Sequence, residues 1–472
     1  MELLENRKRI KALSNDDKRE KVVKALSQIV FDDAKILRMI QTFEEQIQLA
    51  NSTDENKRSQ TDLFWENTFV RGLFDGTECG TYLGMDLGGT NFRVVRVDMK
   101  DGKANTQTKY YNLEKKLLVG SSSELFDYIA VSLRSFLSEE IFPYQEVPLG
   151  FTFSFPSRQV SLKRSTISTW TKSIKCTDGV GLDSVSLLEE AIDRLGRDTF
   201  PVRVNVVARI SDTTGTLLAG NLLDHECKIG LILGTGSNAA FVEYIRNIEK
   251  WDTCYKDNDP SDKVVINCEF GALGDNGCLD FMKTEFDREL DRHSNHPGSY
   301  TFEKHYSGHY LGELVRLALV RLAADGLVFA ETPCDKLSER WALTTSHVTD
   351  IERVTDGDSP TLQAFLEEFG VSSPSEDDIL LVREVCELMS TRGAYIVATA
   401  MVVLLNHIDL PEVTIAVDGS LYEHHPKYHN NMASFIAKWR PQTKTTLRLV
   451  KDGSGQGGAL VAAIEAKSAK RP

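Results

Sequence analysis

Two strand–turn–strand segments of similar sequence constrain the fold more than any other feature. In each, an apolar strand leads into a turn of glycine and hydroxyl residues that closes on Asn, and a second apolar strand follows. The first segment covers 82–97 and the second covers 229–244. They lie roughly 150 residues apart, which is typical of a fold built from two similar halves.

The rest of the chain alternates between strands and helices without a Pro-rich or Ser-rich linker. Helical spacing of apolar residues covers about the first 75 residues, apart from a polar loop predicted at 51–60. The order predicts an α/β protein with two lobes and a central cleft. Further strands are predicted at 147–153, 202–207, 413–417 and 446–450, and further helices at 125–137, 187–195, 278–290, 310–324, 379–406 and 459–467.

Composition narrows the classes of partner. The 472 residues carry a net charge of −14, which disfavours binding to nucleic acid or to an anionic membrane. The longest apolar run, 394–405, is shorter than the ~20 residues that span a bilayer, and residues 1–13 lack the apolar stretch of a signal peptide. The eight cysteines include no CxxC pair, so free thiols are expected. The sequence predicts a cytoplasmic protein without stable membrane association.

The first hairpin turn has the residue types of a phosphate-binding loop. Gly88 and Gly89 let the backbone approach a ligand closely, and Thr90 adds a hydroxyl donor. Arg93 can make a charge-assisted contact, and Asp86 can orient a water molecule on Mg²⁺. The alternative is an ordinary tight hairpin, since Asn and Gly are common turn residues.

Two later glycine-rich segments carry the same pair of interpretations. The turn at 234–238 is a second phosphate loop or a plain turn. The segment 452–458 comes just before the predicted helix at 459–467, and a glycine-rich approach to a helix N-terminus suits a nucleotide. The alternative there is a loop with an N-terminal cap. Two similar turns in one chain favour the functional interpretation.

Two pairs of histidines have the spacing of metal ligands on one face of a helix. His305 and His309 stand four residues apart, as do His425 and His429, but no third ligand is evident. Exposed helix faces are therefore the expected positions of these histidines.

These motifs together resemble the eukaryotic hexokinase and glucokinase family, over roughly residues 20–466. The agreement is specific because many long motifs occur in the family's order. They are LGMDLGGTNFR at 83–93, LGFTFSFP at 149–156, WTK at 170–172, DTTGT at 212–216, GTGSN at 234–238, EFGALGD at 269–275, FEK at 302–304 with SG at 307–308, DGSLY at 418–422 and GSGQGG at 453–458.

The resemblance implies the actin-like ATPase (ribonuclease H-like) fold, with a sugar in the cleft and Mg²⁺-ATP across it. It implies that Asp212 is the catalytic base. It implies sugar contacts from Ser154, Thr171, Lys172, Ser211, Asn238, Glu269 and Glu303. It implies that ATP is held by Asp86, Gly88, Gly89, Thr90, Asn91, Arg93, Thr235, Ser420, Gly455 and Gly457, and that Asp86 and Asp212 lie near Mg²⁺ through water.

Elementary chemistry agrees with the role implied for Asp212. A sugar hydroxyl is a poor nucleophile, so a carboxylate must take its proton during phosphoryl transfer. Asp212 follows a predicted strand and starts a predicted helix, which gives it a firm support. The alternative is that Asp212 merely caps the helix.

The chain departs from the family's pattern at several positions. Ser211 replaces the Asn that usually precedes the catalytic Asp, so one or two sugar hydrogen bonds are expected to be lost. Glu339-Arg340-Trp341 aligns with the Thr-Arg-Gly of the nucleotide loop, where a Trp is expected to fill space and to deny a left-handed backbone. Ser173-Ile174 replaces Gly-Phe, and Phe64–Asn67 replaces a Met-Leu-Pro segment.

The main interpretation is a monomeric, single-unit hexokinase that transfers the γ-phosphate of ATP to the 6-hydroxyl of glucose or a related hexose, the first step of glycolysis. Its small lobe is predicted at 77–207 with 453–472, and its large lobe at 208–452 with 1–76. The departures leave open a sugar-binding regulator with weak catalysis. A third alternative is an actin-type or chaperone-type ATPase without a sugar substrate, against which the motif at 170–172 argues.

Overall fold

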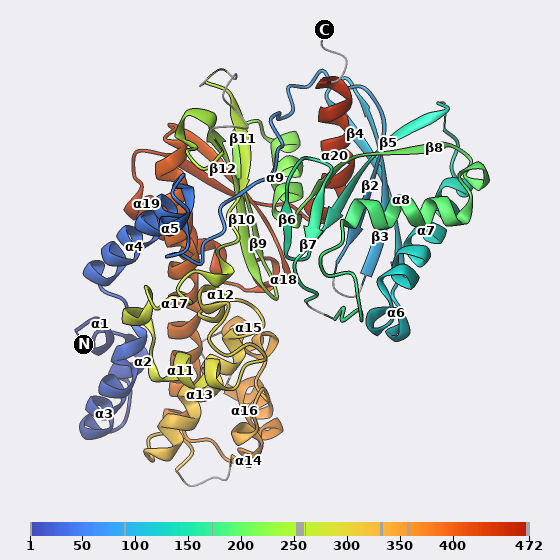
Figure 1. Ribbon diagram of the computed structural model, residues 1–472. Helices are drawn as coiled ribbons and strands as arrows, with labels where there is room; N and C mark the ends of the chain where they lie inside the picture. The colour runs from blue at the N-terminus through green and yellow to red at the C-terminus, as the bar shows by residue number, and fades with distance from the viewer. Residues whose placement is uncertain are drawn as a thin grey trace.

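The computed structural model describes residues 2–88, 91–142, 144–171, 173–251, 259, 261–330, 334–355 and 359–468. Two main sheets organise this part of the chain (Figure 1). The first has the order β4-β3-β2-β5-β8, and the second has the order β1-β11-β10-β9-β12-β13. Their strands are β1 (Glu66–Asn67), β2 (Gly80–Leu87), β3 (Asn91–Lys100), β4 (Lys103–Asn112), β5 (Glu146–Phe153), β8 (Arg203–Ile210), β9 (Cys227–Leu233), β10 (Ser237–Tyr244), β11 (Lys263–Asn267), β12 (Glu412–Asp418) and β13 (Lys444–Leu449).

The two sheets repeat one topology, which confirms the prediction of two similar halves. Apart from the short β1 at the edge of the second sheet, the first three strands of each form an antiparallel meander, and the fourth strand pairs in parallel with the first. A fifth strand adds in parallel to the fourth. The central strands β2 and β5 are almost continuously buried, as expected for strands covered on both faces.

Two helices pack between the sheets and against each other (Figure 1). Helix α9 (Asp212–Leu223) covers the second sheet, and α20 (Gly453–Ser468) covers the first. A side-chain carbon at Gly457 would clash with Gly215, so the close crossing requires glycine. The shared core of these helices includes Leu217, Val461 and strand residues of both sheets.

Most of the remaining helices belong to the part of the molecule that contains the second sheet (Figure 1). The longest, α17 (Glu376–Ile408), is the one described helix long and apolar enough to cross a membrane, but 89% of its apolar window is buried inside the structure, as in a core helix. The others are α1 (Glu2–Glu5), α2 (Lys8–Lys11), α3 (Asp16–Leu26), α4 (Asp33–Asn51), α5 (Glu55–Arg58), α6 (Lys115–Val119), α7 (Ser122–Glu139), α8 (Ser184–Leu195), α11 (Glu285–Arg292), α12 (Thr301–Lys304), α13 (Leu311–Ala324), α14 (Asp335–Ser338), α15 (Thr345–Arg353), α16 (Ser359–Glu368), α18 (Ser420–His424) and α19 (Tyr428–Trp439). A small third sheet pairs β6 (Ser157–Gln159) with β7 (Ser165–Ile167).

Several sequence predictions need correction. The helix predicted at 278–290 begins only at Glu285, because Thr284 and Asp287 form a capping box that starts a new helix there. The final helix begins at Gly453, so its glycines lie within its first turns rather than before it. The loop predicted at 51–60 contains α5, and β4 escaped prediction because its sequence is polar and largely exposed.

The histidine pairs are not on exposed faces as a group. His305 is buried and its Nδ1 lies 2.8 Å from an oxygen of Asp287, and His425 is also buried. No cluster of three or more metal-ligating side chains occurs among the residues that the structure describes. The seven cysteines in the same part of the chain are free, as predicted. The lobe boundaries given above stay predictions.

Candidate active site

Asp212 lies where β8 passes into α9, at the face between the two sheets. The chain leaves β8 at Ile210, Ser211 caps the helix, and Asp212 is its first residue. The Ser211 hydroxyl accepts from the Thr214 N–H at 3.4 Å and lies 2.8 Å from the Thr213 hydroxyl. The alternative in which Asp212 itself is the cap is therefore wrong. Asp212 is half-buried at this helix N-terminus.

Asn267, which the sequence prediction missed, hydrogen-bonds to Thr213, the residue after Asp212. It also hydrogen-bonds to Asn238 and Glu269, two predicted sugar contacts. Its side-chain oxygen accepts from the Thr213 hydroxyl at 3.0 Å and from the Asn238 amide at 2.9 Å. Its amide donates to Glu269 at 2.7 Å, and Asn238 donates to the same Glu269 oxygen at 3.1 Å. Its signal was its position at the end of a buried strand, two residues before Glu269.

Glu269 and Glu303 are held by unusual backbone geometry. Glu269 has φ +48, and Tyr300, which caps α12, has φ +58. The N–H of Ser237 donates to Glu303 at 3.2 Å, so this carboxylate lies against the second hairpin. Asp275 accepts from the Tyr300 N–H at 3.0 Å and fixes the turn. Such left-handed residues cost of order 1 kcal/mol or more and cluster at functional sites.

Ser154 and Thr171 are half-buried and belong to the first half of the chain. Ser154 follows β5, and its N–H donates to the Leu87 carbonyl at 3.4 Å. The buried Arg209 guanidinium donates to the carbonyls of Phe153 at 2.9 Å and Phe155 at 3.2 Å, and thereby fixes the segment around Ser154. Sequence reasoning missed Arg209. Lys172 lies outside the described residues.

The first hairpin holds a charged network at the start of α20. Both Nε and Nη2 of Arg93 donate to one oxygen of Asp86, at 2.9 and 2.6 Å. Arg93 also donates to Asp452 and to the Ser454 hydroxyl, each at 2.6 Å. Burial lowers the pKa of Arg93, but Asp86 and Asp452 outweigh it and raise that pKa overall. Gly88 directly follows β2 and Asn91 begins β3, whereas Gly89 and Thr90 lie outside the described residues.

Asp86 fits a magnesium site. Its second oxygen, Oδ1, is buried and has no hydrogen-bond partner in the described part of the chain. An oxygen of this kind suits a hydrated Mg²⁺, which proteins bind through one or two carboxylates together with substrate phosphates.

The remaining predicted nucleotide contacts gather around the second hairpin and α20. The carbonyl of Thr235 accepts from the Ser307 hydroxyl at 3.0 Å and from the His309 N–H at 3.1 Å. Ser420 begins α18, with its backbone near Gly234. Gly457 serves the helix crossing described above, and a side chain at Gly455 would clash with Arg93, so both glycines have a packing role.

Two family models, each described as hexokinase, match residues 21–222 and 228–464. The chain belongs to the hexokinase family. Human Hexokinase-1 is 35% identical over 465 residues, which make up 97% of this chain and 49% of that protein. Human Hexokinase-2 is 34% identical over 95% of this chain and 48% of that protein. This hexokinase-family chain thus spans about half the length of these curated relatives.

Solved structures agree. Hexokinase from Schistosoma mansoni complexed with glucose superposes with a TM-score of 0.82 at 34% identity, over 96% of this chain and 100% of that one. A second hexokinase crystal structure gives 0.77 at 26% identity, over 95% of this chain and 100% of that one. The predicted α/β, actin-like ATPase fold is confirmed.

Trp341, one of the departures from the family's pattern, does not have the effect predicted for it. Trp341 has φ +64, so Trp does adopt the left-handed backbone it was expected to deny. Its N–H donates to Glu313 at 2.8 Å, and its ring stacks on His309 with centroids 5.3 Å apart and planes 18° apart. His309 contacts Thr235, so the aromatic stack adjoins the second hairpin.

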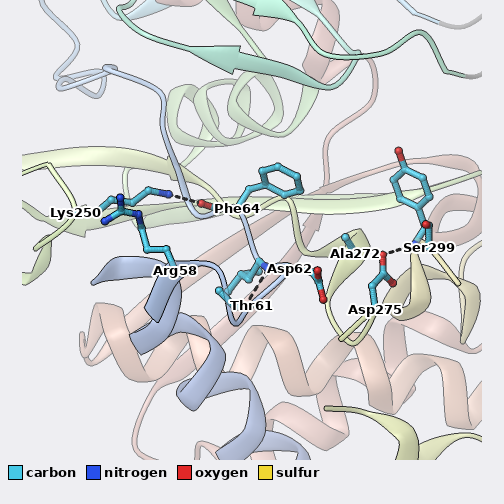
Figure 2. Close-up of a pocket in the computed structure, with 11 residues that line it drawn as sticks. Arg58, Thr61, Asp62, Phe64, Lys250, Ala272, Asp275 and Ser299 are labelled. Carbon is cyan, nitrogen blue, oxygen red and sulfur yellow. Dashed lines mark hydrogen bonds between the residues drawn. The ribbon is translucent and has the colours of Figure 1, made fainter. Parts of the chain in front are cut away.

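A hollow of about 480 Å³ is lined by Asp275 and Tyr300 together with residues from 50–64 and Lys250 (Figure 2). Lys250 donates to the Phe64 carbonyl at 2.8 Å on one side, and Asp275 lies on the other. None of its lining residues is a predicted sugar or phosphate contact. The hollow is therefore distinct from the predicted sugar and phosphate contacts, although Asp275 and Tyr300 adjoin both.

Proposed function

We propose that the chain is an ATP-dependent hexokinase that transfers the γ-phosphoryl group of ATP to the 6-hydroxyl of glucose or a related hexose. The observation that carries this proposal is the hydrogen-bonded chain Thr213–Asn267–Glu269 beside Asp212. These hydrogen-bond acceptors beside a carboxylate that can act as a base support the proposal. The proposal also takes the protein to be a cytoplasmic monomer, on its composition alone.

In this proposal, Asp212 accepts the proton of the 6-hydroxyl as phosphoryl transfer proceeds. Glu269 and Glu303 accept hydrogen bonds from other sugar hydroxyls, so the site rejects ligands that lack them. Ser154, Thr171, Lys172 and Asn238 complete the sugar contacts. Ser211 is assigned to helix capping instead, since its hydroxyl already meets Thr213 and Thr214.

On the nucleotide side, Asp86 would hold hydrated Mg²⁺ through Oδ1, with Asp212 also nearby through water. The metal ion, when bound, neutralises charge on the β- and γ-phosphates. Arg93 supplies a fixed positive charge, because Asp86 and Asp452 orient its guanidinium. The backbone from Gly88 to Asn91, with Thr235, Ser420, Gly455 and Gly457, is proposed to line the rest of the ATP site.

A coupled assay with glucose, ATP and magnesium tests the proposal. Asp212→Asn keeps the size of the side chain but removes the base, so kcat should fall about 10²- to 10⁴-fold. The exposed Asp198→Asn is the matched control and should retain wild-type kcat. Equal activity in both variants would refute the role of Asp212. Glucose binding by calorimetry without turnover in wild type would instead indicate the weakly catalytic, sugar-binding regulator.

A further inference from the structure

Glu66 lies at the edge of the second sheet, beside the sugar-side cluster. It pairs with Asn267 across the antiparallel strands β1 and β11. Directly opposite residues of such a pair point to the same face, with Cβ atoms about 4.5–5.5 Å apart. Asn267 contacts Thr213, Asn238 and Glu269 on that face. The Glu66 side chain therefore projects toward the predicted sugar contacts.

The residues around Glu66 confirm which face it occupies. The preceding residue, Trp65, packs into the core on the opposite face, with its ring centroid 5.0 Å from that of Phe241. Val265 shares a face with Asn267 and belongs to the core between the two sheets. Glu66 is half-buried, so its side chain is enclosed but accessible to a small molecule.

None of the described charged groups near Glu66 forms an ion pair with its carboxyl group. Burial and the neighbouring Glu269 raise the pKa of Glu66 to about 7, against the opposing effect of Arg209, Lys250 and Arg158. The Arg209 guanidinium donates to backbone carbonyls, as described above. Within the described ranges, the Glu66 carboxyl group has no hydrogen bond or ion pair. This carboxyl group can therefore accept a hydrogen bond from a ligand at the edge of the sugar-side cluster.

We propose that Glu66 is a further carboxylate of the hexose site, which favours a hexose bearing an ammonium group over a neutral hexose. The inference rests on the proposed function. An ammonium group near an ionised carboxylate gains a charge-assisted hydrogen bond, whereas a hydroxyl gains a weaker, neutral–ionic one. The ammonium group also stabilises the ionised form of Glu66, so binding of an amino sugar releases a proton from this group.

Calorimetry with glucosamine and with glucose at pH 6.5, in two buffers of different ionisation enthalpy, counts that proton. Wild type should release a large fraction of a proton with glucosamine and close to none with glucose. Glu66→Gln should abolish the release and lower the ratio of kcat/KM for glucosamine to that for glucose roughly three- to thirtyfold. Glu45→Gln, on the exposed face of α4, is the matched control and should behave as wild type.

The outcomes separate this inference from the proposed function. If wild type binds and phosphorylates neither sugar, the proposed function fails. If it uses both and Glu66→Gln keeps the proton release and the ratio, Glu66 is not part of the site. Should Glu66→Gln not fold, Glu66→Asp tests the same point, because it retains the charge on a side chain one carbon shorter. Its ratio should then be intermediate, and a wild-type ratio would overturn the inference.

Discussion

Helices α9 and α20 occupy equivalent places in the two halves of the molecule. Helix α9 follows β8, the last strand of the first sheet, and α20 follows β13, the last strand of the second. Each helix then packs on the sheet of the other half, α9 on β9 and α20 on β2 and β5. The halves are therefore interlocked through their final helices, which cross at Gly215 and Gly457.

The two helices begin with different chemistry. Helix α9 begins at Asp212 under the Ser211 cap, whereas α20 begins at Gly453 after Asp452 with φ +58. Asp212 brings a carboxylate to the first turn of α9, whereas the N–H of Gly453, the first of α20, donates to Asp418 at 3.1 Å. One repeated position thus carries the predicted base in the first half and a predicted nucleotide-contact segment in the second. The two halves share one strand topology, and they differ in the residues at their helix starts and hairpin turns.

The two hairpins also differ in the residues that face each other across their strands. A substitution at Asn267, which bonds to the second hairpin, tests this difference. The first hairpin places Asp86 opposite Arg93, whereas the second places Ile232 opposite Asn238, an uncharged amide that bonds to Asn267. Asn267→Leu removes three hydrogen bonds that hold Thr213, Asn238 and Glu269 in place, so misplaced sugar contacts should lower kcat/KM for glucose roughly hundredfold. Steady-state kinetics measures this.

The control for Asn267→Leu is Asn205→Leu, at an exposed position of β8, which should keep wild-type kinetics. The KM for ATP should stay within a few-fold of wild type in both variants, because the first hairpin is untouched. An Asn267→Leu variant that loses ATP and glucose affinity equally would show that Asn267 does not act on the sugar side alone.

Asp418, at the end of β12, should make stability depend on pH. Burial raises the pKa of Asp418 to about 6, although Arg93 and the Gly453 N–H oppose this. The folded state thus binds more protons than the unfolded state between about pH 4 and 6, so this group's contribution to stability falls as pH rises through that window. Asp418→Asn should be more stable than wild type at pH 7.5 by up to about 3 kcal/mol.

Urea unfolding at pH 7.5 and pH 4.5 measures that difference. The advantage of Asp418→Asn should shrink at pH 4.5, where wild-type Asp418 is largely protonated in the folded state. An advantage that is equal at the two values would mean that the carboxyl group does not titrate as its burial requires.

Gly457→Ala breaks the crossing that joins the halves. The added carbon would clash with Gly215 in the facing helix, and backbone cannot move aside as a flexible side chain can. Overpacking of this kind costs about 1–3 kcal/mol in the free energy of unfolding. Gly234→Ala is the control for stability, since its nearest heavy atom would be 3.6 Å away. Equal denaturation midpoints for the two variants would contradict the tight crossing.

Sequence reasoning succeeded where a pattern is local. Apolar runs predicted the buried strands, and the strand–helix junction at Asp212 was placed correctly because strand and helix periods change there. It failed where partners come from distant segments. Nothing local indicates that Asn267 bridges α9 and β10, that Arg209 bonds behind Ser154, or that the glycines after Asp452 are helical because α9 lies against them.

Trp341 extends this contrast to a single backbone angle. A left-handed non-glycine residue costs about 1 kcal/mol, and a ring stack returns about 0.5–1.5 kcal/mol. Trp341→Gly removes both the strain and the stack with His309, so the free energy of unfolding should change by less than about 1 kcal/mol. Trp341→Ala keeps the strain and loses the stack, so it should be about 1 kcal/mol less stable than Trp341→Gly. Equal stability of the two variants in urea would show that the backbone at 341 relaxes once the ring is gone.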